Sequence, residues 1–457
     1  MNNPSYQNNV IGFLDDATDK VSKRIGGFPI LGTISQMKHY IEYYRIESLF
    51  IAMPSATSER VSQIIKDSHE YNIEVKILNQ SEDLLSEYDV KKNIRPITIA
   101  DILGRTEIHL DNDEIKRLVQ GESVLVTGAA GSIGSELCRQ ILKYNPKRLV
   151  MIDINENGLY QLQNELGFDQ KSGKIDSSIE LVCLILSICD KHEINKAFRE
   201  FKPVIIFHAA AHKHVPFMED TPAEAIKNNI FGTNNLIKSA KEFKVKTFVS
   251  ISTDKAVNPT NVMGATKRFI EKMIQSMTGH SETKFVAVRF GNVLGSNGSV
   301  VPLFTRQIEN GGPVTVTHRD MVRYFMTIPE AVSLVLQAAT FGHGGELFVL
   351  DMGEPVKIYD LATKMIRLAG FEPQRDIKIE ITGLRPGEKL FEELLMSEEG
   401  LRPTDNELIF VAKPLDVDEA EVQSDLELLK KSLDKETTRS EVIELLKQVV
   451  DTYQPEE

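Results

Sequence analysis

The stretch Val124-Leu125-Val126-Thr127-Gly128-Ala129-Ala130-Gly131-Ser132-Ile133-Gly134 joins an apolar strand to a predicted helix over Ser135–Tyr144. Three glycines at three-residue spacing lie in the turn. Gly128 permits a tight bend there, and Gly131 lets the backbone approach a pyrophosphate. Gly134 allows the helix to pack closely on the strand, and the helix N-terminus then faces the phosphates. This strand–loop–helix unit predicts a dinucleotide site in a doubly wound sheet.

An acidic residue completes the dinucleotide signature. The strand Leu149–Ile152 ends at Asp153, about 20 residues beyond the glycines, where a carboxylate binds the adenosine ribose hydroxyls and repels a 2′-phosphate. The pattern therefore favours NAD over NADP. The glycine motif and the following Asp153 together resemble the extended short-chain dehydrogenase/reductase superfamily. The small residues Ala209-Ala210-Ala211 fit this resemblance, because they would let a dinucleotide lie against the end of the fourth strand. Ser187-Ile188 stands where that superfamily commonly holds adenine with an Asp–hydrophobic pair.

Strands alternate with helices along most of the chain, which is typical of a parallel sheet. We predict an α/β protein: a doubly wound parallel Rossmann sheet with a small C-terminal substrate cap, preceded by a second, smaller Rossmann-like α/β domain without its own glycine-rich loop. The larger sheet's strands are predicted at Val124–Thr127, Arg148–Ile152, Leu181–Ile185, Val204–His208, Thr247–Ser252 and Phe285–Phe290. The predicted parts are an N-terminal domain at 1–98, a connector at 99–121 with a helix at 111–120, the dinucleotide-binding domain at 122–415 with cap elements after about 292, and a charged helical segment at 416–457.

The composition is that of an ordinary folded protein, with 41% hydrophobic and 26% charged residues. A formal net charge of −13 makes general nucleic-acid binding a poor expectation. Three cysteines without a CxxC pair argue against a disulfide scaffold or a structural zinc site and favour a reducing compartment. The sequence has no run of about 18 apolar residues and no secretory signal, so we expect a cytoplasmic chain without a membrane span.

A polar trio ends the fifth strand of the larger sheet. Thr253-Asp254-Lys255 supplies a hydroxyl, a carboxylic acid and an amine, which suffice to remove one proton and to protonate a leaving group. The superfamily's usual base is a Tyr four residues before a Lys; here Lys267 is present, but Met263 occupies the Tyr position. Methionine carries no proton, so a dehydrogenase or epimerase that relies on this tyrosine is disfavoured. Taken alone, the trio is equally consistent with a solvated ion pair in a turn, and Met263 with a core methionine.

The residues around the trio carry a more specific resemblance. Ile251–Val257 and Pro259–Arg268 resemble the bacterial UDP-N-acetylglucosamine 4,6-dehydratases of the CapD-like polysaccharide-biosynthesis family, and within it the PglF-like enzymes of protein glycosylation. The resemblance covers most of residues 123–410. Full-length members carry transmembrane helices ahead of the N-terminal domain, which implies an inner-membrane anchor that this chain lacks. The other matching motifs are His208–Pro216, Arg289–Ser296, Arg323–Ile328 and Leu384–Leu390.

The resemblance implies an internal redox elimination on a UDP-sugar, in which hydride moves from sugar C4 to NAD and back to C6 after water leaves. Thr253 would hydrogen-bond the C4 oxygen, Asp254 would protonate the departing C6 hydroxyl, and Lys255 would be the base at C5. A lysine base must be neutral, so we expect burial or nearby cations to lower the pKa of Lys255. Lys267 would bind the nicotinamide ribose. Met263 would be an apolar wall, which implies retention at C5 and a xylo-series 4-keto product.

Candidate binding residues follow from the same motifs. A diphosphate needs cationic donors, and arginine suits bidentate phosphate binding. The substrate-binding candidates are Lys213, Val215, Asn292, Arg323, Arg385 and Glu388. The cofactor-binding candidates are Gly128, Gly131, Ser132, Ile133, Gly134, Asp153, Ser187, Ile188, Ala209, Ala210, Ala211 and Lys267. The histidines at 208, 212 and 214 lack a carboxylate cluster at ligand spacing and suggest no metal.

Two other functions stay open at this point. One is a nucleotide-sugar 4-epimerase on the same fold, and the other is a non-catalytic NAD-dependent sensor with the first domain as an interaction module. Loss of one water distinguishes dehydration from epimerisation, whereas the intact trio and Lys267 argue against the sensor. Because the superfamily commonly pairs subunits through helices such as the one holding Lys267, we expect a homo-oligomer, a dimer or larger.

Overall fold

The structure is a computed structural model that describes residues 9–53, 58–69, 71, 73–78, 94–96, 98–103, 112–279, 281–395, 400–413, 417–434 and 436–455. The chain divides into two compact units: one comprises residues 1–106, 307–314 and 362–379, and the other comprises the remainder. Of the helices in the described residues, none is both long and apolar enough to cross a membrane. The predicted domain boundaries stay predictions. The connector helix predicted at 111–120 is α5 (Asn112–Val119), and Asp111 lies outside the described residues.

The N-terminal part of the first unit contains two three-stranded sheets, β1-β3-β2 and β4-β5-β6. In each sheet the central strand is parallel to one neighbour and antiparallel to the other. Apolar side chains of α1, α2 and β4, such as Met37, Ile41, Ile51 and Ile64, form its core. The elements are β1 (Phe13–Leu14), η1 (Thr18–Lys20), β2 (Arg24–Ile25), β3 (Phe28–Gly32), η2 (Ile34–Gln36), α1 (Met37–Tyr44), β4 (Ser48–Ile51), α2 (Ser58–His69), β5 (Glu74–Leu78), β6 (Ile94–Pro96) and α4 (Ile99–Ile102).

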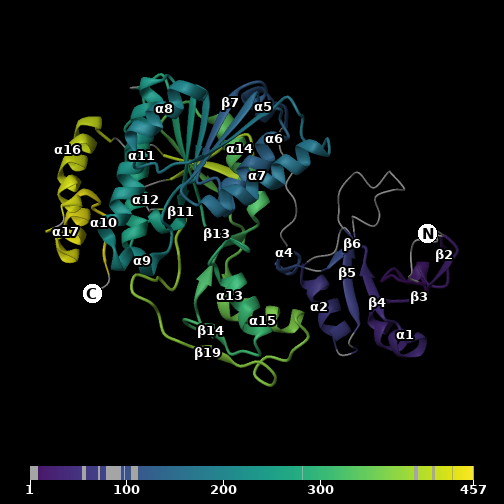
Figure 1. Ribbon diagram of the computed structural model, residues 1–457. Helices are drawn as coiled ribbons and strands as arrows, with labels where there is room; N and C mark the ends of the chain where they lie inside the picture. The colour runs from purple at the N-terminus through teal and green to yellow at the C-terminus, as the bar shows by residue number, and fades with distance from the viewer. Residues whose placement is uncertain are drawn as a thin grey trace. The chain divides into compact units, whose positions relative to one another are not determined.

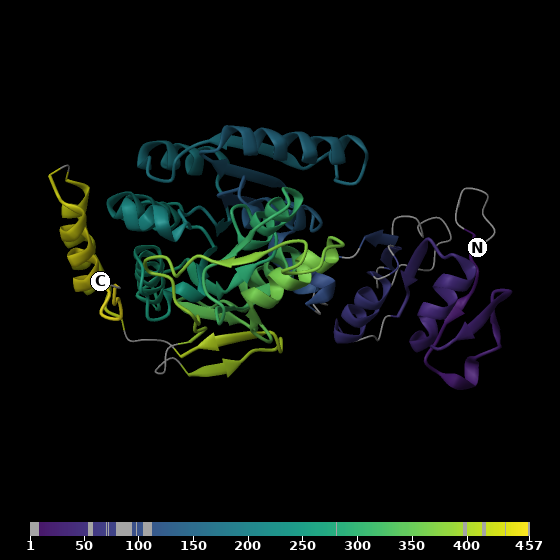
Figure 2. The ribbon, with the colours of Figure 1, turned by 90° about the horizontal axis from the view of Figure 1, so that it is seen from below.

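A nine-stranded sheet of the order β20-β21-β17-β12-β11-β10-β7-β8-β9 organises the second unit. The seven strands from β17 to β9 are parallel, and β21 and β20 are antiparallel additions at one edge, which Figure 2 shows. Strand order reverses between β7 and β10, as in a doubly wound sheet, so the predicted fold class is confirmed. The strands are β7 (Ser123–Thr127), β8 (Arg148–Asp153), β9 (Glu180–Ile185), β10 (Ile205–His208), β11 (Thr247–Thr253), β12 (Lys284–Phe290), β17 (Glu346–Leu350), β20 (Leu401–Pro403) and β21 (Ile409–Ala412).

Helices cover both faces of this sheet (Figure 1). On one face lie α5, α6 (Ser132–Leu142), α7 (Glu156–Lys171) and α14 (Ile328–Phe341); on the other lie α8 (Lys191–Phe201), α11 (Gly232–Glu242) and α12 (Val262–Gln275). The shorter elements are α9 (Val215–Asp220), α10 (Pro222–Ala225), the π-helix η3 (Ile226–Phe231), η4 (Asp254–Ala256), β13 (Asn292–Val293), α13 (Val300–Glu309), β14 (Val314–Val316), β15 (Val322–Arg323), β16 (Phe325–Met326), β18 (Val356–Lys357), α15 (Ile358–Leu368) and β19 (Ile379–Ile381).

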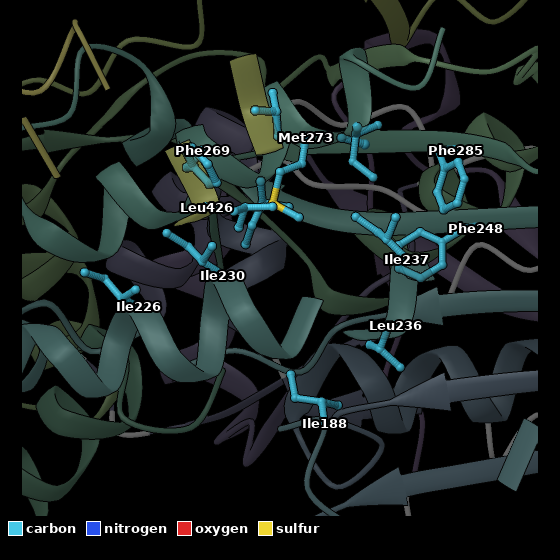
Figure 3. Close-up of a cluster of buried hydrophobic side chains, with 14 of the residues drawn as sticks. Ile188, Ile226, Ile230, Leu236, Ile237, Phe248, Phe269, Met273, Phe285 and Leu426 are labelled. Carbon is cyan, nitrogen blue, oxygen red and sulfur yellow. The ribbon is translucent and has the colours of Figure 1, made fainter. Parts of the chain in front are cut away.

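Strand periodicity decides which side chains enter which core. Because successive strand residues point to opposite faces, Leu125 packs in the cluster under α11 and α12, whereas Val124 and Val126 pack in the cluster under α6 and α14. Figure 3 shows the first cluster, where the rings of Phe248 and Phe285 from neighbouring strands lie with their centroids 5.3 Å apart. The carboxyl ends of the parallel strands are thereby held at one edge of a rigid sheet.

Two C-terminal helices cover α12. They are α16 (Glu419–Leu429) and α17 (Arg439–Val449), joined by η5 (Lys430–Leu433). Leu426 lies beside Met273 in the core cluster (Figure 3), and Lys272 donates hydrogen bonds to Glu421 at 2.7 Å and Asp425 at 3.0 Å. Subunit pairing through the helix that holds Lys267 would therefore have to accommodate α16 and α17. A homo-oligomer stays a prediction.

The segment after Asn292 does more than form a cap. It returns β17, β21 and β20 to the main sheet, and α14 packs against α5 and α6. Short strand pairs outside the main sheet include β13 with β16 and β15 with β18. These pairs place Asn292 and Arg323 near the carboxyl end of β11.

Candidate active site

The glycine-rich turn adopts the close packing that its sequence requires. Gly128 has φ +68°, and a Cβ there would come 2.6 Å from the backbone nitrogen of Ala210. A Cβ at Gly134 would collide with the carbonyl oxygen of Gly128. Helix α6 begins directly after Gly131, so its unpaired N–H groups face the turn. These residues fit a dinucleotide pyrophosphate.

The other cofactor candidates lie at neighbouring strand ends. The Asp153 carboxylate at the end of β8 accepts hydrogen bonds from the backbone of Ala130 and Asn155, both at 2.9 Å, which fixes it beside the glycine turn. The Ala209 nitrogen donates to the Thr127 carbonyl at 3.1 Å, and Ala210 and Ala211 follow, both half-buried.

Four further cofactor candidates, Ser132, Ile133, Ser187 and Ile188, lie in different surroundings. Ser132 accepts a hydrogen bond from the Asn297 nitrogen, and Ile133 packs against the core under α6. The Ser187 hydroxyl accepts a hydrogen bond from the Cys189 nitrogen at 3.2 Å. Ile188 is buried in the core cluster of Figure 3. An adenine contact by Ser187 and Ile188 stays a prediction.

His208 belongs to the sheet rather than to a metal site. Its ring nitrogens lie 2.8 Å from the hydroxyl oxygens of Thr127 and Thr233. Burial, with a smaller contribution from the charge of Lys267, lowers the pKa of His208 to about 3, so the ring is neutral at physiological pH. Within the described ranges, no three His, Cys, Asp or Glu side chains come together as a metal site.

The trio at the end of β11 forms a hydrogen-bonded cluster around a buried carboxylate. Thr253 Oγ1 donates to Asp254 Oδ1 at 2.8 Å, and Lys255 Nζ donates to the same oxygen at 3.0 Å. Lys255 Nζ also donates to Asn292 Oδ1 at 3.3 Å. Asp254 is fully buried, and its Oδ2 has no hydrogen-bond partner within the described part of the chain. The interpretation of a solvated ion pair is therefore wrong, because the sheet encloses the carboxylate.

The expected lowering of the Lys255 pKa is wrong for this chain. Burial by itself lowers the pKa, but the carboxylates of Asp254 and Glu392 outweigh it and raise the pKa above the usual lysine value. The expected lowering rests on burial and on cations near the amine, whereas Glu392 adds a second carboxylate beside it. Lys255 is therefore an ammonium group at neutral pH in the chain described here.

Helix α12 carries Met263 and Lys267 behind the trio. Its N-cap, Asn261, accepts a hydrogen bond from the Gly264 nitrogen at 2.8 Å, and a side chain at Gly264 would collide with the Lys255 carbonyl. Lys267 Nζ donates to the Ile251 carbonyl at 2.9 Å, and burial lowers the pKa of Lys267 to about 8. Met263 is 4% exposed and packs in the core cluster.

The two arginines among the substrate candidates, Arg323 and Arg385, lie in different surroundings. Arg323 is buried, and its guanidinium donates to the carbonyls of Lys389 at 2.7 Å and Leu390 at 3.2 Å, so it holds that segment in place. Arg385, with three residues of the 214–217 segment, lines an open hollow of about 350 Å³. Diphosphate binding by either arginine stays a prediction.

The other substrate candidates are Glu388, Val215, Lys213 and Asn292. Glu388 accepts a hydrogen bond from the Arg385 nitrogen at 3.3 Å. Val215 begins α9 next to the hollow, and Lys213 is exposed just before it. Asn292 lies against Lys255, as described above. The structure thus brings Asn292 to the trio, whereas it leaves Lys213 and Arg385 at the surface.

Sequence reasoning missed two buried acidic groups. Glu392 lies 3.9 Å from Lys255 Nζ, and nothing in the run Phe391-Glu392-Glu393 marks it apart from its neighbour. Glu271 on α12 accepts hydrogen bonds from Arg289 at 2.7 and 3.0 Å under the trio. For Glu271 a signal existed, because it lies four residues after Lys267 and so on the same helix face.

Comparison with known proteins relates the chain to proteins of polysaccharide biosynthesis. A family model described as polysaccharide biosynthesis protein matches residues 124–414, and one described as CoA-binding domain matches residues 1–78. The chain is 50% identical over 371 residues to the capsular polysaccharide biosynthesis protein CapD of Staphylococcus aureus, which covers 81% of this chain and 61% of that protein. The chain therefore spans less than two thirds of that relative's length.

Two more distant relatives carry different activities in their names. A UDP-N-acetylglucosamine 4,6-dehydratase (inverting) of Campylobacter jejuni is 33% identical over 287 residues, 62% of this chain and 80% of that protein. A UDP-glucose 4-epimerase of Rickettsia bellii has the same identity, over the same number of residues and the same shares of both chains. Identity alone therefore does not separate the two reactions.

Proposed function

The chain belongs to the polysaccharide biosynthesis protein family, and from that premise we propose that it is an NAD-dependent 4,6-dehydratase of UDP-N-acetylglucosamine that supplies bacterial glycan or glycoprotein synthesis. The observation that carries the proposal is the hydrogen-bonded Thr253-Asp254-Lys255 cluster with its buried carboxylate, with Met263 at the position of the usual tyrosine. A hydroxyl, a carboxyl group and an amine in one enclosed cluster can serve an elimination, which needs both an acid and a base.

The chain's own residues would move two protons. Bound NAD would supply the redox chemistry, by accepting a hydride from sugar C4 and returning it at C6. The carboxylate of Asp254 takes the C4 hydroxyl proton through Thr253 and gives it to the departing C6 hydroxyl, which leaves as water. Lys255, once neutral, takes the C5 proton and later returns it to C5. Lys267 binds the nicotinamide ribose. The sum is loss of one water, with every proton accounted for.

Product analysis tests the function and its stereochemistry together. We expect UDP-N-acetylglucosamine to lose one water and to give the xylo-series 4-keto sugar, because Lys255 returns its proton to the face it came from. Met263 offers no proton to the opposite face. Mass spectrometry measures the water, and proton NMR coupling constants of the fresh product report the configuration at C5. An arabino-series product, as the name of the inverting relative would suggest, would contradict the proposed retention.

A 4-epimerase is the second candidate, favoured by the relative of that name. It would leave the substrate mass unchanged and would give a C4 epimer in the same experiment. The non-catalytic sensor would bind NAD and form neither product. Met263 weighs against an epimerase that relies on the usual tyrosine, because its thioether cannot exchange a proton with the C4 hydroxyl.

The cofactor proposal has its own test at Asp153. We expect the purified protein to contain NAD, and we expect Asp153→Asn to reduce the NAD-over-NADP affinity ratio by about 10-fold or more, equivalent to roughly 1.4 kcal/mol. The amide oxygen can keep the hydrogen bond from Ala130 while the negative charge is lost. Isothermal titration of both nucleotides measures the ratio. Glu156→Gln, an exposed acid in the first turn of α7, is the matched control and should leave the ratio unchanged. Extraction of chiefly NADP from the wild type would refute the choice.

A further inference from the structure

A buried carboxylate outside the proposed proton path lies beside the Lys255 amine. The Glu392 side chain is 3% exposed, and its Oε1 lies 3.9 Å from Lys255 Nζ and 3.7 Å from Arg323 Nη2. The next residue, Glu393, is 51% exposed and pairs with Lys389 at 2.7 Å. Two adjacent glutamates thus occupy opposite environments, and only one of them faces the proposed base.

The segment that carries Glu392 is fastened to the active-site loop. Asn261, the N-cap of α12, donates its side-chain amide to the Gly387 carbonyl at 3.1 Å. Arg323 donates to the Lys389 carbonyl at 2.7 Å. Arg289 donates to the Leu394 carbonyl at 3.0 Å, so the backbone is held both before and after Glu392, and the carboxylate is fixed beside the trio.

The charges around Lys255 come from three parts of the chain. An opposite charge within about 4–6 Å favours the charged form of an amine, and a like charge disfavours it. Two carboxylates face Lys255, Asp254 from its own turn and Glu392 from the segment after β19. The guanidinium of Arg323 from β15 and the neutral amide of Asn292 from β13 face it as well. The charge of Lys389 acts on Glu392. Two carboxylates against one nearby guanidinium leave a net negative surrounding.

We propose that Glu392 is a positioning residue, which holds the Lys255 amine at the trio and sets the pH at which it becomes a base. That this pH matters for turnover rests on the proposed function. The electrostatic coupling between Glu392 and Lys255 does not depend on that function. Removing the Glu392 charge removes an attraction that favours the ammonium, so the pKa of Lys255 falls. The released proton goes to water, because the Lys255 side chain is 18% exposed. Burial lowers the pKa of Lys255, and the charge of Glu392 acts against it by raising that pKa, as this geometry implies.

Competitive labelling of amines with acetic anhydride tests the coupling without turnover. Peptide mass spectrometry follows acetylation of Lys255 against pH in the wild type, Glu392→Gln and Glu393→Gln. We expect Glu392→Gln to lower the half-labelling pH by roughly 1 unit, as loss of a unit charge about 4 Å away implies after partial screening by Arg323. Glu393→Gln, the matched control, should leave it unchanged, because that side chain is mostly exposed.

Kinetics and labelling together distinguish the inference about Glu392 from the proposed function. In the kcat/KM profile for UDP-N-acetylglucosamine, the acidic limb should move to lower pH by the same amount in Glu392→Gln, an effect that a purely structural defect would not produce. Unshifted labelling in folded Glu392→Gln overturns the inference. Shifted labelling with no turnover in the wild type overturns the proposed function and leaves the coupling intact. Should Glu392→Gln not fold, Glu392→Asp, which withdraws the carboxylate by one methylene, should give a smaller shift in the same direction, and no shift overturns the inference.

Discussion

Lys255→Met is expected to reduce kcat by about 10³-fold or more while NAD stays bound. A positioned general base contributes roughly 10²–10⁴-fold to a rate, and Lys255 is the amine of the trio, 3.0 Å from Asp254 and 3.3 Å from Asn292. Methionine keeps the length of the side chain but can neither accept nor donate the C5 proton. Product formation followed by mass spectrometry measures the loss, and nucleotide extraction from the variant verifies that the cofactor site is intact.

Two further variants separate the base from a structural cation. Lys255→Arg keeps a positive charge and hydrogen-bond donors toward Asp254, but a guanidinium does not lose its proton in this pH range. It should therefore be as inactive as Lys255→Met. Lys246→Met removes an exposed lysine, paired with Glu122 at the surface, and should retain full activity. Near-normal turnover by Lys255→Met or Lys255→Arg would exclude Lys255 as the essential base.

The largest expected effect on stability is at Glu271. Its two carboxylate oxygens accept hydrogen bonds from Arg289 at 3.0 and 2.7 Å, and Ser252 donates to it at 2.6 Å. Both charged side chains are fully buried. Glu271→Ala leaves the buried guanidinium of Arg289 without this partner, which costs about 3–5 kcal/mol of unfolding free energy. Urea denaturation followed by circular dichroism measures the difference.

The controls for this prediction use burial as the variable. Glu180→Ala removes the partner of Arg148 in a pair whose glutamate is 49% exposed, and it should cost about 0–1 kcal/mol. Replacing both members of this pair, as Glu271→Leu with Arg289→Met, should recover only part of the loss. The Arg289 guanidinium is then no longer buried without Glu271, but Arg268, which lies 3.2 Å from Glu271, still loses that contact. A loss below about 1 kcal/mol for Glu271→Ala would show that the buried pair does not contribute as its geometry implies.

Local sequence signals were sufficient for the central sheet. The strand predicted at Arg148–Ile152 is observed as Arg148–Asp153, and the one predicted at Phe285–Phe290 is observed as Lys284–Phe290. Apolar runs between turn residues define such strands, and Gly128 could be assigned because its positive φ and close approach to Ala210 exclude a side chain. The position of the trio also follows from the sequence, because the end of the predicted fifth strand fixes where Thr253 lies.

Contacts between distant parts of the chain were beyond the sequence argument. Glu392 and Glu393 are chemically identical, and only the fastening of their loop by Arg323 buries one of them. Burial lowers the pKa of Lys255, but the charges of Asp254 and Glu392 outweigh it, so the sign expected from the sequence is wrong. The return of Glu346–Leu350 to the main sheet was likewise hidden, because a short apolar run carries no information about its partner strand.

The fastened loop also limits how this family can diversify. Gly387 is held by Asn261, and Glu392 lies five positions later, with its carboxylate 3.9 Å from Lys255 Nζ. Gaining or losing one residue between them would exchange the two glutamates or remove both from the amine. Selection should therefore reject insertions and deletions here while it accepts substitutions at exposed Phe391. New sugar specificities would then arise by changing side chains on a loop of constant length.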